Sequence, residues 1–158
     1  MARALEVAGI TDRSHELRLA PVAFLDARTA VHTAVHTGEL ADAATLVDRA
    51  FADFPGAWAE PYARAAGAEL AVVAGLPDAA ERLAAAASAA EQNHWAAACL
   101  ARAAGRLNQN LDAYAAAVSR WERIGAHLER AYTLLLLPAR AAEGHAELAA
   151  RGLPPPPG

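Results

Sequence analysis

Two histidines have the spacing of metal ligands. His32 and His36 are four residues apart, so on a helix they share one face, where two imidazoles can bind one zinc ion with Glu39 or Asp42 as a further ligand. The usual metalloprotease pattern has a glutamate directly after the first histidine, where this chain has Thr33. We therefore favour a polar stripe that lines a groove, and expect neither a metal nor a cofactor.

Other candidate chemistry is equally sparse. Glu91 and His94 have the Glu-x-x-His spacing of di-iron bundles, but such a site requires two of these motifs, and a turn is predicted inside this one. Cys99 is the single cysteine and lies in an alanine-rich segment, so a buried, unreactive thiol is expected. No Gly-x-Ser-x-Gly or Gly-x-Gly-x-x-Gly motif and no phosphate-binding loop occurs. The chain is predicted not to be an enzyme.

Composition limits the partners that the chain could have. Its 158 residues carry a net charge of -4, which argues against binding to the nucleic-acid backbone, a contact that needs a basic face. The first residues do not form a signal peptide, and the longest aliphatic run, Leu134 to Leu137, is too short to cross a bilayer. We expect a cytoplasmic protein with no direct contact to nucleic acid or membrane.

Helical patterns recur along the chain between glycines, prolines and asparagines, and no strand pattern is present. Asn93 is a predicted N-cap. Three regions are expected, namely an N-terminal helix remnant over 1–20, a helical domain over 21–152 and an extended, proline-rich tail over 153–158. The predicted helices cover residues 2–8, 21–38, 39–54, 58–75, 77–92, 94–107, 111–125, 127–137 and 138–151.

A pattern of small residues repeats through the helical domain. It consists of Gly38, Ala43, Val47, Ala50 and Pro55, and these residues resemble the second half of a tetratricopeptide repeat. Weaker copies begin at Gly75 and Asn108, with the key alanines at 80, 87, 113 and 117. The first alanines of the copies are about three dozen residues apart, close to the period of that family.

This resemblance covers residues 22–151 and implies a fold. It implies an all-α protein in which antiparallel helical hairpins stack as a short right-handed α-solenoid, with about three repeats and a degenerate fourth hairpin over 127–151. A second alternative stays open, in which the helices close into a bundle that binds a metal or cofactor through His32 and His36. A third is self-association, because the end helices of a short array expose small apolar faces that a second copy could cover.

The last third of the chain carries a narrower resemblance. The segments 101–107, 111–114 and 121–137 are similar to the C-terminal helical repeats of actinobacterial LuxR-type ATPase regulators and of the related cyclase–ATPase–repeat signalling proteins. The resemblance implies the sensor or repeat part of a transcriptional or signalling regulator. Its function would be that of a protein-interaction or regulatory scaffold module, which binds a protein or peptide segment such as another domain of the same regulator.

The tetratricopeptide resemblance also indicates where a partner would bind. In that family the first helix of each hairpin lines a concave groove, where arginines could bind carboxylates and aromatic side chains could serve as anchors. Trp58 and Trp121 are expected in the core instead. The candidate partner-binding residues at the matching positions are Arg28, His32, His36, Tyr62, Glu69, Trp95, Arg102 and Arg106.

Overall fold

The computed structural model describes the backbone of residues 2–54 and 57–157, and the side chains of residues 19–54 and 57–157. All regular structure in these residues is helical, as the sequence predicted. The elements are α1 (Ala2–Thr37), α2 (Ala43–Ala50), α3 (Glu60–Val73), α4 (Ala79–Ala85), α5 (Ala89–Gln92), α6 (His94–Asn108), α7 (Leu111–Arg123), α8 (His127–Leu134), the 3-10 turn η1 (Pro138–Arg140) and α9 (Ala141–Ala149).

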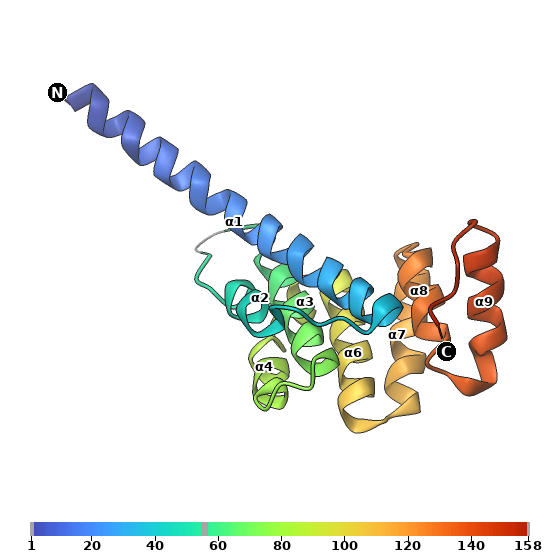
Figure 1. Ribbon diagram of the computed structural model, residues 1–158. Coiled ribbons are helices and arrows are strands. Elements are labelled where there is room, and N and C mark those ends of the chain that lie inside the picture. Colours follow the sequence, from blue (N-terminus) through green and yellow to red (C-terminus); the bar gives the residue numbers. More distant parts are fainter. Residues whose placement is uncertain (1, 55–56, 158) are drawn as a thin grey trace.

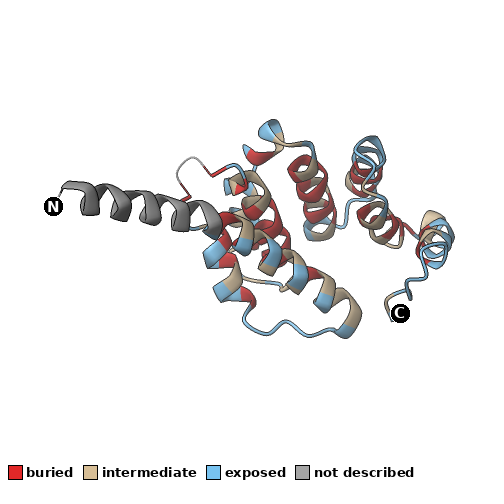
Figure 2. Ribbon diagram, turned by 90° about the horizontal axis from the view of Figure 1, so that it is seen from above, coloured by how far each residue is buried: buried red, intermediate tan, exposed pale blue. Residues whose placement is uncertain are grey.

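The chain runs from α2, α3 and α4 at one side through α6, α7 and α8 to α9 at the other, and α1 lies along α2 and α3 (Figure 1). Helix α1 packs on α3, and α3 packs on α6. Buried residues lie on the sides where the helices face one another, and exposed residues lie on the outward sides (Figure 2). Within the described part of the chain, no helix combines the length and the apolar character needed to span a bilayer.

Helix α1 differs from the two separate helices that were predicted for this part of the chain. Separate helices were expected on either side of a break between Gly9 and Pro21, whereas α1 is one continuous helix with Pro21 inside it. A proline in a helix interior removes one backbone donor and costs about 3 kcal/mol. Here Ala20 and Ala23, on either side of the proline, are both buried in one cluster with Phe54 and Ala63. This packing holds the helix together through Pro21.

Side-chain caps begin two of the helices, and the first of these caps was predicted. The Asn93 side chain accepts a hydrogen bond from the backbone N–H of Ala96 at 2.9 Å, so α6 begins directly after it. The Asn110 side chain accepts from the N–H groups of Asp112 and Ala113 at the start of α7. Both asparagines satisfy donors that a helix N-terminus leaves free.

The segment over residues 77–92 differs from the prediction in two ways. The single helix expected over 77–92 is divided into α4 and α5. Ala79 and Ala86 are buried there, whereas Ala80 and Ala87, which the repeat pattern selected, are exposed. The predicted positions were thus wrong by one residue. Neighbouring alanines are indistinguishable in a sequence pattern, and only packing decides which of them faces inward.

Small residues permit the closest contacts between helices. A Cβ atom at Gly67 of α3 would lie 2.5 Å from the Cβ of Ala50 in α2. A Cβ at Gly105 of α6 would lie 2.6 Å from the ring of Tyr114 in α7. Both distances are shorter than atoms can approach, so these crossings require glycine. Most of the buried core consists of alanine, with Trp121 as its largest fully buried side chain.

The last helical segment ends near the C-terminus as predicted. Gly152 has a positive φ of 67°, and the N–H of Leu153 donates to the carbonyl of Leu148, which terminates the last helical segment. Residues 153–157 have no regular structure.

We predict that Gly67→Ala destabilises the protein although alanine is the better helix former. The added methyl group would collide with Ala50, and overpacking of this kind typically costs about 1–3 kcal/mol. The improved helix propensity returns about 1 kcal/mol at most. Chemical denaturation monitored by circular dichroism measures the change in free energy of unfolding. Ser119→Ala, at an exposed position in α7, is the control for helix propensity alone. Equal or greater stability of Gly67→Ala would contradict the close crossing.

Candidate functional site

A buried ion-paired network contains several of the candidate partner-binding residues. Its centre is Arg102 of α6, which is only 4% exposed. Arg102 donates from Nε to Glu69 Oε1 at 2.6 Å and from Nη2 to Glu69 Oε2 at 2.9 Å. Two parallel hydrogen bonds of this kind are the strongest arrangement between a guanidinium and a carboxylate. Helices α3 and α6 are therefore joined by a fixed, buried pair.

The second carboxylate of the network comes from α8. Arg102 Nη1 lies 2.7 Å from Glu129 Oε2, although the two groups are not aligned as a hydrogen bond. The same Nη1 donates to the backbone carbonyl of Glu129 and to Thr133 Oγ1, both at 3.3 Å. The guanidinium also lies over the ring of Trp121, 5.3 Å from its centroid. Each nitrogen of this buried guanidinium thus has a polar partner, which burial of a charge requires.

Helix α1 reaches the network from the other side. Arg28 Nε donates to Glu129 Oε1 at 2.9 Å, and His32 Nε2 lies 3.3 Å from the same oxygen. One turn further along α1, His36 Nε2 lies 2.7 Å from the hydroxyl of Tyr132. Side chains of the first helical segment therefore contact the fourth hairpin across about a hundred residues of chain. We call these three contacts between α1 and α8 the clasp.

Arg102 and the clasp together change the acidity of Glu129. Burial by itself raises the pKa of a carboxyl group. At Glu129 the nearby positive charges outweigh burial, Arg102 most strongly and then His32 and Arg28, so the pKa lies well below its ordinary value of 4.5. Glu129 is consequently ionised at neutral pH and serves as a permanent anionic partner for the two arginines.

Cys99 lies beneath the same network. Its Sγ donates to Glu69 Oε2 at 3.2 Å, and the residue is fully buried. Burial raises the pKa of the Cys99 thiol well above its usual range, and the Glu69 carboxylate raises it further. A thiol with a raised pKa is a poor nucleophile. The predicted buried cysteine is confirmed, and its contact with the network was not foreseen.

Arg106 lies outside the set of paired charges. Its Nε atom is buried and forms no hydrogen bond with the described residues. Removal from water lowers the pKa of Arg106, and the neighbouring Glu69 offsets part of that effect. Arg28, Arg102 and Arg106 together outnumber Glu69 and Glu129. These five residues therefore carry one net positive charge within a chain that is acidic overall.

The aromatic candidates form a separate group, which continues from the surface to the core. The ring of Trp58 lies 6.0 Å from that of Tyr62, Tyr62 lies 5.7 Å from Trp95, and Trp95 lies 5.6 Å from Trp121. Phe24 of α1 packs edge-on against both Tyr62 and Trp95. Trp121 is fully buried, as predicted. Trp58 is 72% exposed, so its predicted core position is wrong. It immediately precedes α3, where the side chain projects beyond the packed helices.

Six of the eight candidate residues thus fall into two sets, and the other two stand apart. Arg28, His32, Glu69 and Arg102 meet in the ion-paired network, while Tyr62 and Trp95 meet in the aromatic group. His36 contacts Tyr132, and Arg106 contributes positive charge without a hydrogen-bonded partner at Nε. Glu69 and Arg102 are buried, so a partner could reach them only after the clasp had opened.

The metal alternative gains no support from this geometry. His32 and His36 each direct Nε2 to a different side chain of α8. In the described residues, no three side chains of histidine, cysteine, aspartate or glutamate are grouped so that they could hold a metal ion. Glu91 and His94 lie on different helices, separated by the extended cap residue Asn93.

The side chains with which α8 contacts Arg102 and helix α1 were not predicted from the sequence. Glu129, Tyr132 and Thr133 belong to the degenerate fourth hairpin, where the repeat pattern gives no register. A weak signal was available, because Glu129 and Thr133 are four residues apart and share a helix face. That spacing occurs at many surface positions, and nothing in it indicates a buried pair with Arg102.

Comparison of the chain with protein-family models, with curated proteins and with solved structures finds no match.

We predict that Glu129→Gln destabilises the protein by about 3–5 kcal/mol at neutral pH. The substitution removes the negative charge that balances Arg28 and the buried Arg102. The difference from the wild type should shrink in acid. The pKa of Glu129 is lowered by folding, so the unfolded state takes up the proton first as the pH falls below about 4.5, and the stabilisation is lost there. Denaturation curves at several pH values test both expectations. A pH-independent difference would contradict the role of the charge.

Cys99 provides an internal reporter of the same network. Its thiol should react slowly with a disulfide reagent in the native wild type and many times faster in Glu129→Gln, because opening exposes it. Glu143→Gln is the matched control, since Glu143 forms ion pairs with Arg130 and Arg140 at the surface. Rapid labelling of the native wild type would show that the network does not close over Cys99.

Proposed function

We propose that this chain is a protein-interaction module of the tetratricopeptide type, which acts as a regulatory scaffold by binding a segment of another protein. The successive packing of α3 on α6, α6 on α7, α7 on α8 and α8 on α9 (Figure 1) and the glycine crossings at Gly67 and Gly105 support the repeat assignment. The regulatory role rests on the similarity of residues 101–137 to the C-terminal repeats of LuxR-type and cyclase–ATPase–repeat regulators.

The exposed Trp58 is the observation that carries the interaction role. A tryptophan exposed to 72% leaves a large apolar surface in water, and such surfaces mark interaction sites when they adjoin other apolar groups. Trp58 has such a neighbour in Tyr62, which is in turn packed against Phe24 and Trp95. We call Trp58, Tyr62 and Trp95 the aromatic edge.

The aromatic edge has the properties of a binding hot spot. Tryptophan and tyrosine dominate hot spots because they bury a large area and lose little conformational entropy on binding. At this edge the rings beneath Trp58 are already ordered by edge-on contacts with one another. A partner would therefore pay little entropy to order the surface that it meets. The partner that fits is a peptide or protein segment with apolar side chains facing Trp58 and Tyr62.

The buried ion-paired network determines which other residues a partner can contact. Because Glu69 and Arg102 satisfy each other, the accessible members of the predicted groove are those at its rim. Arg28 is anchored through Nε to Glu129, so its terminal Nη groups are oriented while the side chain remains 35% exposed. An acidic group near the apolar side chains of the partner would complement Arg28.

We predict that Trp58→Ala weakens partner binding by about 2 kcal/mol, roughly a thirtyfold increase in Kd. The partner would be identified by crosslinking in cells of the source organism, and its affinity would be measured by calorimetry. The fold should be unaffected, because Trp58 is exposed. Leu111→Ala, which removes a side chain 54% exposed on α7, is the matched control and should bind normally. Equal binding by Trp58→Ala and wild type would contradict the aromatic edge.

A further inference from the structure

Helix α1 has an outward face that no part of the described chain covers. Its inward side buries Ala20, Ala23, Ala27 and Val31. On the opposite side four residues, three or four positions apart, form a continuous stripe along the helix. This outer stripe consists of Val22, Leu25, Thr29 and Thr33, all of which are exposed, Val22 to 53% and Leu25 to 54%. Exposed residues follow the outward side of α1 in Figure 2.

The two flanks of the outer stripe have opposite charge. On one flank a depression of about 350 Å³ is lined by Arg28, His32 and His36. Glu129 of α8 contacts Arg28 and His32 there, but it shares its single negative charge with Arg102, so the flank stays basic. On the other a depression of about 410 Å³ is lined by Asp26 and Glu39 and by no basic side chain.

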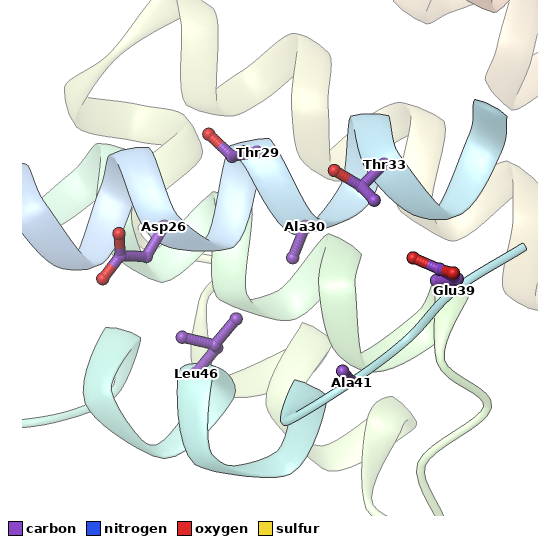
Figure 3. Close-up of a pocket in the computed structure, with 7 residues that line it drawn as sticks. All are labelled: Asp26, Thr29, Ala30, Thr33, Glu39, Ala41 and Leu46. Carbon is purple, nitrogen blue, oxygen red and sulfur yellow. The ribbon is translucent and has the colours of Figure 1, made fainter. Parts of the chain in front are cut away.

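Figure 3 shows how the acidic flank is built. Asp26 and Ala30 point from α1 toward α2, and Glu39 approaches from the connecting loop. Thr29 and Thr33 line both depressions, so the outer stripe is the ridge between the acidic and the basic flank.

A surface with this layout complements a second copy of itself in one orientation. If two α1 helices face each other across a two-fold axis parallel to their length, the acidic flank of each meets the basic flank of the other. Both helices then run in the same direction. A two-fold axis perpendicular to the helices, which makes them antiparallel, would oppose like charges. Opposed like charges at an interface are unfavourable, whereas complementary flanks fix the orientation.

The outer stripe suits such a contact sterically as well. The apolar members Val22 and Leu25 can bury surface against their counterparts, and the short side chains of Thr29 and Thr33 permit a normal helix separation of about 8–10 Å. We propose that the outer stripe of α1 is a homodimer interface, in which α1 packs in parallel against α1 of a second copy. The contact is isologous, so each favourable pair occurs twice.

The mass in solution tests the proposal. Light scattering or analytical ultracentrifugation of the wild type should show the mass rising from 16.4 kDa toward twice that value as concentration increases. Val22→Glu and Asp26→Arg should each remain monomeric over the same range, the first by charging the apolar contact and the second by opposing the partner's basic flank. Leu111→Glu, at an equally exposed leucine on α7, should dimerise like the wild type. Thermal midpoints by circular dichroism establish that the variants are folded.

Engineered disulfides test the orientation. In a parallel dimer, like residues of the outer stripe meet, so Val22→Cys and Thr33→Cys should each form a symmetric crosslink under mild oxidation. In an antiparallel dimer at most one of them could, because the two positions are about 16 Å apart along the helix. The wild type should not crosslink, since Cys99 is buried. A strictly monomeric wild type, a dimer unaffected by Val22→Glu, or crosslinking at one position only would each overturn the proposal.

Discussion

The buried guanidinium of Arg102 constrains the arrangement of the surrounding helices. A charge removed from water requires a full set of partners, or it destabilises the fold by several kcal/mol. Arg102 obtains them from Glu69 of α3 and from Glu129 of α8. Two carboxylates exceed its single charge, and Arg28 of α1 supplies the next cation. Electrostatic balance therefore links four helices, while the alanines and glycines between them set how closely the backbones approach.

This network changes the role of the side that a helical repeat would use for binding. Most of the polar residues that could contact a ligand in an open groove here bind one another, and α1 contacts α8 across it through side chains. Two other surfaces remain available. The aromatic edge presents Trp58 on ordered rings, and the outer stripe of α1 presents apolar and hydroxyl side chains between oppositely charged flanks. Because these surfaces involve different residues, mutation can test the proposed partner binding and the proposed self-association separately.

The helical elements were largely predictable, and the exceptions have identifiable causes. Asn93 and Asn110 mark helix starts through local hydrogen bonds, which depend only on residues three positions away or fewer. Continuity of α1 through Pro21 was not predictable, because it depends on Ala20 and Ala23 packing against residues more than thirty positions away. The choice of Ala79 over Ala80 depends in the same way on which methyl group faces α3, and the sequence contains both.

The sequence by itself determined that the chain is helical, where most helices begin and end, and which polar and aromatic residues stand out among the alanines. These properties follow from local preferences and short-range periodicity. The tertiary structure decided the partners of those residues. Glu129 meets Arg28 from 101 positions away, and its own hairpin has no repeat pattern to indicate its orientation. Trp58 and Trp121 are the same residue type, yet one is exposed and the other buried, because burial depends on how the helices are stacked.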